Sequence, residues 1–370
     1  MSLTTRRLTD LEPAPPDLAA HLPSAGHAFA PTTPESMAAV LAAASDERAP
    51  VLVWGAGTHQ GLGHAVHPEV VLSTAGLGRV IAWEPDDLTV VVEAGITLGA
   101  LETLLAERRQ TALLPETQPH ATIGGVIAAG VSGYRRARFG PTRDRVLQVS
   151  VVTGDGRLVT GGGRVVKNVS GYDLPRLVVG SFGSIGVVTS VCLKLWPIPA
   201  VEATVATTDP TTAWRTAYRP AAVLQTGDGT FAYLQGTEAE VASQARALGG
   251  EARPGFAWPE TPDGDVVVSI RVPPARTAAA VERLPGAGPF VAQHGVGEVV
   301  AAMEPEPDQL MALRGWTEAE GGAMVVLKAP SSLDVDPWGS DPPGLALQRR
   351  LIAAFDPLRI LNPGRLPGRI

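Results

Sequence analysis

Apolar and polar positions alternate in short blocks through the first 200 residues, a pattern typical of brief strands separated by helices. Runs rich in valine, isoleucine and leucine that are bounded by glycine or polar turn residues predict buried strands. These strands are expected at residues 51–54, 70–73, 80–83, 88–93 and 185–195. Two further runs, 145–153 and 157–160, flank the turn Gly154-Asp155-Gly156 and predict a hairpin.

Helices are predicted where a capping side chain precedes a helical repeat of apolar residues. The clearest repeat has leucines at 98, 101, 104 and 105, which lie on one face of a helix. The expected caps and helices are Thr33 before a helix that opens at Pro34 and runs to about Ala44, Thr97 before 98–109, Thr122 before the small-residue run 123–130, and Asp173 before a short helix that ends at Gly180.

The pattern weakens after residue 200, where strands are expected only at 266–272 and 324–327. A polar, proline-rich stretch then leads to a final helix over 345–355. No internal repeat is present. The expected organisation is a lead-in over 1–30, a first domain over 31–200, a smaller α+β domain over 201–343, and a returning helix and tail over 344–370.

The composition restricts the classes of function. A net charge of −7 without a basic, aromatic stretch argues against a nucleic-acid partner. No apolar run reaches the roughly 18 residues of a membrane span, so no integral membrane segment is expected. Met1–Asp10 has no apolar stretch behind its arginines, so we expect a cytoplasmic protein without a secretory signal. The single cysteine, Cys192, rules out an internal disulfide framework.

Clusters of glycine at the ends of strands or starts of helices are the most informative feature. Loops without side chains let backbone N–H groups approach a diphosphate closely. The clusters lie at 55–63, 124–133 and 180–186. None has the spacing of a Rossmann fingerprint or a P-loop, and any one of them alone is more often an ordinary turn. Spacing alone therefore indicates only candidate nucleotide-binding loops.

The order and the amino-acid sequences of these segments resemble those of the FAD-binding domain of the vanillyl-alcohol oxidase (PCMH-type) family. The similarity covers residues 34–199 and the tail. Within that family the sequences of these segments are most similar to those of the FAD-binding subunits of glycolate oxidases. The matching segments are Trp54–Thr58, Thr122–Gly125, Gly140–Asp144, Gly163–Leu177, Val179–Thr189 and, in the tail, Phe355–Leu366.

The resemblance implies an α+β fold with a PCMH-type FAD-binding domain of two α/β subdomains, a smaller α+β cap domain and a C-terminal return segment. It implies that FAD lies between the two subdomains, with its diphosphate on the first loop and its adenosine side near 183–187. The FAD-binding residues it implies are Gly55, Ala56, Gly57, Thr58, Thr122, Gly124, Gly125, Asp144, Lys167, Tyr172, Gly183, Ile185, Gly186 and Val187. For Lys167 and Tyr172 the alternative is that both brace the fold.

Two departures from the family pattern bear on the subfamily and on how the flavin is attached. Many relatives carry glutamate at the position of Phe182, whereas apolar residues there are familiar from the glycolate oxidase subunits, which favours the narrower resemblance. Relatives with covalently bound flavin have histidine at the position of Thr58, whereas the histidine of this chain is one residue later, at 59. We therefore expect FAD to be bound non-covalently.

The seven histidines do not provide the substrate-gripping metal site of similar 2-hydroxy-acid dehydrogenases, because only His294 lies beyond residue 120. His294, followed by Gly295, reads as a lone histidine before a turn. His59, His64 and His67 share one loop, and we expect them to face solvent and to hold no metal. No nucleophile triad stands out. The sequence thus names no catalytic residue.

Three functions remain open. The first is an FAD-binding subunit of a glycolate-type 2-hydroxy-acid oxidase complex that assists or relays electrons for a catalytic flavoprotein. The resemblance implies two partners, a paralogous catalytic FAD subunit and an iron–sulfur subunit, and a cytoplasmic or membrane-peripheral location. The second is a stand-alone FAD-dependent alcohol or sugar oxidase, and the third a scaffold subunit that has lost FAD.

Overall fold

The chain divides into two compact units in the computed structural model, which describes residues 7–164, 171–286 and 288–370. Unit 1 consists of Met1–Ser132, Thr142–Pro197 and Asp341–Ile370, and unit 2 of Gly133–Pro141 and Ile198–Ser340. The sequence prediction had kept 133–141 with the first domain. The chain therefore passes from unit 1 into unit 2 and back twice.

Unit 1 begins with a parallel three-stranded sheet in the order β1-β3-β2, made of His27–Phe29, Val70–Ser73 and Val51–Trp54. Helix α2 (Pro34–Glu47) buries Met37 and Leu41 in the core of this sheet. The predicted cap Thr33 accepts a hydrogen bond from the N–H of Ser36 (3.1 Å). Strand β1 lies within residues 1–30, so part of the predicted lead-in belongs to this sheet.

A second, antiparallel sheet of unit 1 has the order β4-β5-β9-β7-β8. Its strands are β4 (Val80–Glu84), β5 (Thr89–Glu93), β7 (Val146–Val152), β8 (Leu158–Gly162) and β9 (Val187–Lys194). The predicted hairpin is confirmed, because β7 and β8 pair antiparallel around the expected turn. The valines that predicted these strands are buried at Val90, Val92, Val149 and Val191.

The helices of unit 1 start where their caps predicted. Thr97, Thr122 and Asp173 accept hydrogen bonds from main-chain N–H groups at the starts of α3 (Leu98–Ala106), α4 (Ile123–Ala129) and α6 (Leu174–Val178). Helix α3 ends three residues before the predicted Arg109, which has a left-handed φ of 53°. The short elements of unit 1 are Leu8–Asp10, Pro16–Ala19, Gln110–Thr111 (β6), Thr142–Asp144, Trp196–Pro197 (β10) and Pro367–Arg369.

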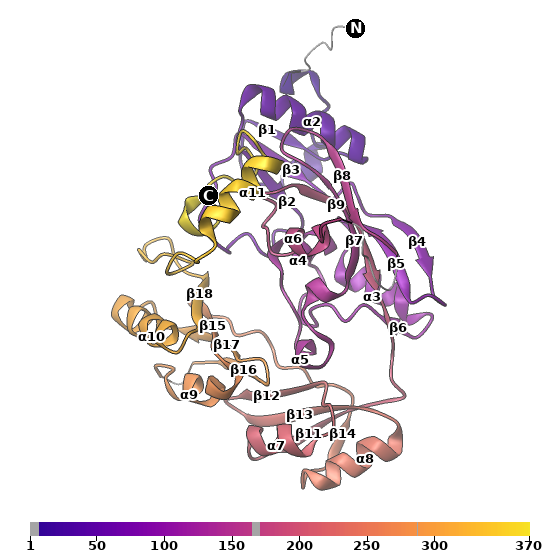
Figure 1. The fold of residues 1–370 in the computed structure, drawn as a ribbon, viewed down its shortest axis with the longest axis vertical. Coiled ribbons are helices and arrows are strands. Elements are labelled where there is room, and N and C mark those ends of the chain that lie inside the picture. The colour runs from indigo at the N-terminus through magenta and orange to yellow at the C-terminus, as the bar shows by residue number, and fades with distance from the viewer. Residues whose placement is uncertain (1–6, 165–170, 287) are drawn as a thin grey trace. The chain divides into compact units, whose positions relative to one another are not determined.

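The C-terminal segment returns to the parallel sheet, as the yellow part of the ribbon in Figure 1 shows. After the predicted helix α11 (Leu345–Phe355), Leu361 forms a parallel bridge with Val51 of β2. The N–H of Val51 donates to the carbonyl of Ile360 (2.7 Å), and the N–H of Asn362 donates to the carbonyl of Val51 (2.8 Å). The tail thus lies beside β2 like a further strand.

Unit 2 is built on an eight-stranded antiparallel sheet in the order β14-β11-β13-β12-β16-β17-β15-β18. The strands are Val201–Thr207 (β11), Ala222–Thr226 (β12), Gly229–Gly236 (β13), Ala252–Pro254 (β14), Val266–Arg271 (β15), Phe290–His294 (β16), Glu298–Met303 (β17) and Ala323–Lys328 (β18). The helices and turns are Arg136–Phe139 (α5), Pro210–Thr216 (α7), Glu238–Ala247 (α8), Pro274–Arg276, Thr277–Glu282 (α9) and Pro307–Ala319 (α10). Only β15 and β18 had been predicted.

The long helices of unit 2 share one face of its sheet. Val223 and Val205 form a core with Val241 of α8, and Val268 and Ile270 form another with Leu310 of α10. In β-strands successive side chains point to opposite faces. The intervening positions, such as Tyr233 and Glu298, therefore lie on the other face of the sheet.

Candidate functional site: a glycine-lined pocket in unit 1

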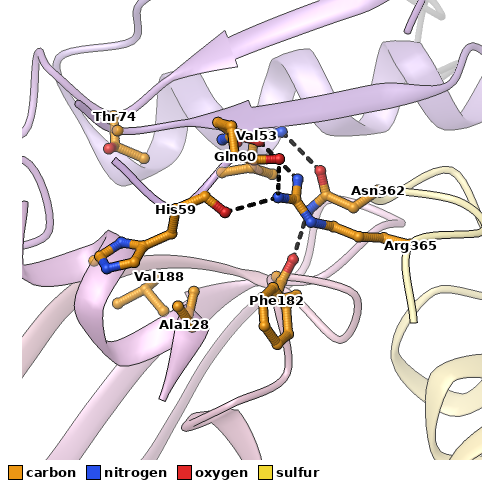
Figure 2. A pocket seen from close by; sticks show the side chains of 14 residues that line it. Val53, His59, Gln60, Thr74, Ala128, Phe182, Val188, Asn362 and Arg365 are labelled. Atoms are coloured by element: carbon orange, nitrogen blue, oxygen red, sulfur yellow. Dashed lines mark hydrogen bonds between the residues drawn. The ribbon is translucent and has the colours of Figure 1, made fainter. Parts of the chain in front are cut away.

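A pocket in unit 1 encloses about 500 Å³ of space, part of it open to solvent. It is assembled from five places in the sequence: the end of β2 with the loop after it, the region after β3, helix α4, the turn before β9 with the start of that strand, and the C-terminal tail. Its lining residues are Val53, Gly55, His59, Gln60, Thr74, Gly124, Gly125, Ala128, Ala129, Phe182, Gly183, Val188, Asn362 and Arg365. Figure 2 shows how the labelled side chains converge on it.

The glycines at the pocket are required by close approach of neighbouring atoms. A Cβ on Gly124 would lie 2.8 Å from the Cβ of Ala94 and 3.1 Å from its carbonyl oxygen. A Cβ on Gly55 would overlap the hydroxyl of Thr122. At Gly125 the nearest atoms would be Thr122 Oγ1 at 3.1 Å and His59 Nδ1 at 3.8 Å, so a side chain there would occupy the pocket itself.

The turn before β9 adopts a backbone conformation that is uncommon for a large residue. Phe182 has a φ of 53°, and Gly183 follows with a φ of 72°. Left-handed backbone at a non-glycine residue persists where surrounding contacts hold it. Here the N–H of Phe182 donates to the carbonyl of Ala128 (2.8 Å), and its own carbonyl accepts from Asn362 Nδ2 (2.7 Å). The turn is thereby fixed to both α4 and the tail.

Two side chains of the tail form part of the pocket wall. Asn362 Oδ1 accepts from the N–H of Val53 (3.0 Å). Arg365 is 4% exposed, and its guanidinium lies 5.7 Å from the centre of the Phe182 ring. Burial lowers the pKa of Arg365 to about 10, so the guanidinium remains charged at neutral pH. The pocket therefore contains a fixed positive charge.

His59 also lies in the pocket wall, which contradicts the prediction that the three loop histidines face solvent. Its Nε2 is 2.9 Å from Gln118 Oε1, and its Nδ1 is 3.1 Å from the hydroxyl of Thr58. Burial lowers the pKa of His59, the hydrogen bond to the side-chain oxygen of Gln118 opposes this, and the charge of Arg365 adds to the lowering. His64 is 8% exposed, whereas His67 does face solvent.

Four of the sequence-predicted site residues line this pocket: Gly55, Gly124, Gly125 and Gly183. Thr122 supports it, because its hydroxyl accepts from the N–H of Gly125 (3.2 Å). The predicted residues that lie outside the lining set are Ala56, Gly57, Thr58, Asp144, Tyr172, Ile185, Gly186 and Val187.

Some of these remaining residues have distinct surroundings. Ile185 and Val187 are buried, whereas Tyr172 is 98% exposed. Asp144 forms ion pairs with Arg176 (3.4 Å) and Arg143 (3.9 Å). Lys167 lies outside the described residues. For all of these residues a role in binding FAD stays a prediction.

Sequence reasoning missed five polar residues of the pocket: His59, Gln60, Thr74, Asn362 and Arg365. The signal for the last two was present, because Asn362 and Arg365 fall in the tail segment that carries the family resemblance. Nothing in the spacing, however, connects residue 365 with residue 60. Their proximity follows only from the return of the tail to β2.

The described residues hold no group of three or more histidine, cysteine or acidic side chains positioned for a metal ion. His294 ends β16, and its Nε2 lies 2.9 Å from Gln225 Oε1. Gly295 after it has a φ of 82°, which agrees with the predicted turn. Among the helices of the described segments, none is long and apolar enough to cross a membrane.

Comparisons with known proteins identify the class of this fold. Residues 25–162 match the family model described as "FAD binding domain". A solved structure of alkyldihydroxyacetonephosphate synthase superposes with a TM-score of 0.65 at 14% identity, covering 94% of this chain and 78% of that one. At this identity the likeness concerns the fold alone.

Curated relatives share more sequence over a shorter range. Glycolate oxidase subunit GlcE of Escherichia coli (strain K12) is 36% identical over 42% of this chain and 45% of its own length. D-lactate dehydrogenase of Archaeoglobus fulgidus is 36% identical, with 45% and 38% covered. Glycolate oxidase subunit GlcD of Bacillus subtilis (strain 168) is 32% identical, with 48% and 38% covered. The chain matches less than half the length of each of these relatives.

Residues 53–125 of the pocket lining fall within the segment that matches an FAD-binding domain, so the class of this domain is that of flavin-nucleotide-binding proteins. More particularly, this chain carries an FAD-binding domain of the PCMH-type family, as its family resemblance predicted. The α+β fold predicted with that resemblance is confirmed.

The pocket fits such a cofactor in its chemistry. Gly125 leaves space that a Cβ would fill, Arg365 brings a buried positive charge to the wall, and apolar side chains such as Val53 and Val188 complete it. An anionic diphosphate attached to flat aromatic rings requires this combination of bare backbone, cation and apolar surface.

Proposed function

We propose that this protein binds FAD non-covalently in the unit 1 pocket and serves as the FAD-binding subunit of a 2-hydroxy-acid (glycolate-type) oxidoreductase complex. The observation that carries the proposal is the assembly of Gly55, Gly124 and Gly183 around one pocket. The first two of these glycines lie within the region that matches the FAD-binding family. The relatives with similar sequence are named as glycolate oxidase subunits and D-lactate dehydrogenases.

Bound FAD would supply the hydride and electron transfer that protein side chains cannot perform. The residues of the pocket would bind and orient it: the glycines by allowing close approach, and Arg365 by its charge. The two ring nitrogens of His59 already lie at hydrogen-bonding distance from Thr58 and Gln118. This arrangement supports non-covalent binding, because neither nitrogen is directed outward as a free nucleophile.

The proposed role within the complex is to assist or relay electrons for a catalytic flavoprotein. It rests on the histidines, of which only His294 lies beyond residue 120. The imidazole of His294 is within hydrogen-bonding distance of Gln225, inside the sheet of unit 2. The proposed partners are a paralogous FAD-binding catalytic subunit and an iron–sulfur subunit. The proposed location is the cytoplasm, with attachment at the membrane surface through the complex.

The first test is the visible absorption of the purified protein before and after acid precipitation. Flavin bands that move into the supernatant would establish non-covalent FAD. Bands that stay with the pellet would contradict non-covalent binding. A colourless protein that takes up no added FAD would favour the scaffold function instead.

The second test mixes the flavin-loaded chain with glycolate or D-lactate under anaerobic conditions and follows flavin absorbance. A relay subunit should keep its flavin oxidised alone and lose the absorbance only when the catalytic partner is added. Rapid bleaching of the isolated chain would overturn the relay role. Steady peroxide production with another alcohol would indicate a stand-alone oxidase.

A further inference from the structure

The C-terminal tail contacts two of the three glycine clusters, the first loop at 55–63 and the second loop at 180–186, although more than 300 residues separate it from the first. Arg365 contacts the first loop, and Asn362 contacts β2 and the turn at Phe182 (Figure 2). These contacts come from side chains for which neither the family match nor the residues predicted from sequence provide a role.

The guanidinium of Arg365 is directed at backbone carbonyls of the first loop. Its Nη2 donates to the carbonyls of His59 (3.0 Å) and Gln60 (2.9 Å), and its Nε donates to the carbonyl of Leu62 (3.1 Å). Its Nη1 donates to the side-chain oxygen of Gln60 (2.7 Å). Gln60 Nε2 in turn donates to the carbonyl of Val53 (2.9 Å) at the end of β2. One cation thereby determines the direction of three peptide groups.

The direction of these peptides determines what the loop presents to a ligand. In a planar trans peptide the N–H points opposite to the C=O. With the carbonyls of residues 59, 60 and 62 turned toward Arg365, the N–H groups of Gly61 and Gly63 point away from it, while the N–H of Gln60 donates to the carbonyl of Gly57 (3.2 Å). Backbone N–H groups oriented together form a concavity that favours an anion. The buried guanidinium therefore acts on the loop through its peptide dipoles.

Asn362 holds the second loop in a similar way. Its side chain accepts from Val53 N–H and donates to the carbonyl of Phe182, so it joins β2 to the left-handed turn. Asn362 itself has a left-handed φ of 44°, which asparagine tolerates better than most residues. The tail is anchored before this point, because Asp356 Oδ2 accepts from the N–H of Leu361 (2.7 Å).

From these contacts we infer that Arg365 and Asn362 are positioning residues for the cofactor. Docking of the tail on β2 orders the two glycine loops. The affinity for FAD depends on this ordering. This inference rests on the proposed binding of FAD in the same pocket. The ordering of the loops can, however, be measured without any cofactor.

The test uses full-length variants Arg365→Gln, Arg365→Lys and Asn362→Gly, with Arg359→Gln as the matched control on an exposed part of the tail. Glycine is chosen at 362 because it retains the left-handed backbone. Lysine at 365 keeps the charge but loses the planar fork of donors. Two quantities are measured on protein stripped of flavin: amide hydrogen exchange of residues 57–64 and 180–186, and the Kd for added FAD by flavin fluorescence.

We expect exchange in 57–64 to accelerate in both Arg365 variants and exchange in 180–186 to accelerate in Asn362→Gly, while Arg359→Gln resembles wild type. The Kd for FAD should rise by about 10- to 100-fold in Arg365→Gln, the loss expected for charge-assisted hydrogen bonds to buried acceptors, and by less in Arg365→Lys. Thermal unfolding of the stripped proteins shows whether each variant is folded.

Wild-type exchange in both loops would overturn the inference, even if the variants were less stable overall. An unchanged Kd despite faster exchange would overturn the dependence of FAD affinity on the tail. If the wild-type protein bound no FAD, while exchange still responded to Arg365→Gln and not to Arg359→Gln, the proposed function would fail and the ordering of the loops by the tail would stand.

Discussion

Units 1 and 2 handle buried polar groups differently. In unit 1, the pocket is bounded by bare backbone of glycines, and a single cation from the tail satisfies the carbonyls of the first loop. In unit 2, the carboxylate of Glu298 is surrounded by side chains of its own sheet and of α5. The first arrangement leaves backbone available for a ligand, whereas the second uses the charge to join parts of a sheet.

The surroundings of Glu298 make this contrast quantitative. Its carboxylate accepts from Arg136 (2.9 Å) and Arg271 (3.1 Å), from Ser269 Oγ (3.0 Å), and from Gln293 Nε2 (3.1 Å). Burial raises the pKa of Glu298, but the charges of Arg271 and Arg136 and the hydrogen bond from Ser269 outweigh it, and the pKa lies below its ordinary value. The carboxylate of Glu298 is therefore ionised at neutral pH, and both of its oxygens accept hydrogen bonds from side chains of unit 2.

The largest effect on FAD binding is expected from a side chain introduced at one of the glycines that line the unit 1 pocket. In Gly124→Val the Cβ meets Ala94 at 2.8 Å, and overpacking of this kind costs about 1–3 kcal/mol. Because Gly124 itself lines the pocket, the displacement that relieves this overlap changes the pocket wall. We expect binding of FAD to fall below detection in a fluorescence titration, and the free energy of unfolding in urea to decrease by that amount.

The matched control is Gly315→Ala on the exposed face of α10 in unit 2, where a new Cβ meets nothing within 4 Å. Alanine in the interior of a helix should stabilise unit 2 by about 0.5–1 kcal/mol and leave the affinity for FAD unchanged. Equal behaviour of the two variants would remove the distinction between glycines that form a site and glycines that do not.

The next largest effect belongs to unit 2. Glu298→Ala removes one partner of a buried charge pair, which costs about 3–5 kcal/mol when the remaining charge is buried. Arg271 and Arg136 keep 58% and 26% of their side-chain surface exposed, so water can solvate them and the cost should be reduced to about 2–3 kcal/mol. Urea unfolding followed by circular dichroism measures it.

The same variant separates the two units functionally. Since the four hydrogen-bond partners of Glu298 named above all belong to unit 2, the Kd for FAD of folded Glu298→Ala should equal that of wild type. A rise in Kd comparable to that of a pocket variant would show that the polar network of unit 2 supports the cofactor site.

Much of unit 1 could be predicted because its signals are local. The hydroxyl of Thr122 caps α4 in the structure as its position before a small-residue run indicated, and Val51–Trp54 forms the predicted strand. Strand and helix alternate there with glycine or a cap at each boundary. Local chemistry therefore determines most element ends.

Unit 2 was largely missed because its strands have mixed faces. In β13 the buried residues Tyr233 and Leu234 are adjacent, and β16 ends in the polar pair Gln293 and His294, both buried. A strand covered on both sides loses the alternation that reveals it. Pairings such as β12 with β16 join residues about 70 positions apart, and no local pattern records them.

The pocket could be predicted only in part, because some of its residues belong to local motifs and others are brought there by contacts distant in sequence. Gly55, Gly124 and Gly183 belong to local motifs, whereas the position of Arg365 depends on a β-bridge between Leu361 and Val51. His59 was assigned to solvent because of its expected place beside the diphosphate and because Glu69 is the one acidic residue near that loop. Its burial results from α4 and from Gln118, which are distant in sequence.

The smallest expected effect concerns the protonation of His59 and connects the pocket to the tail. Burial and the charge of Arg365 lower its pKa in the folded protein, whereas the unfolded chain titrates near the ordinary value of about 6.5. Below that pH the unfolded state binds more protons than the folded state, so the free energy of unfolding decreases as the pH falls; above it the effect vanishes.

One such group contributes a slope of at most about 1.4 kcal/mol per pH unit. Urea unfolding of the flavin-free protein at several pH values between 5 and 7.5 measures this slope. Because burial also lowers the pKa of His294, which adds a slope of the same sign, the informative quantity is the difference between wild type and His59→Gln. The slope should be shallower in His59→Gln than in wild type. Arg365→Gln should also reduce it, because removal of the nearby charge makes protonation of His59 easier. Equal slopes in wild type and His59→Gln would mean that the pKa of His59 is the same in the folded protein as in the unfolded chain, which would contradict the expected lowering.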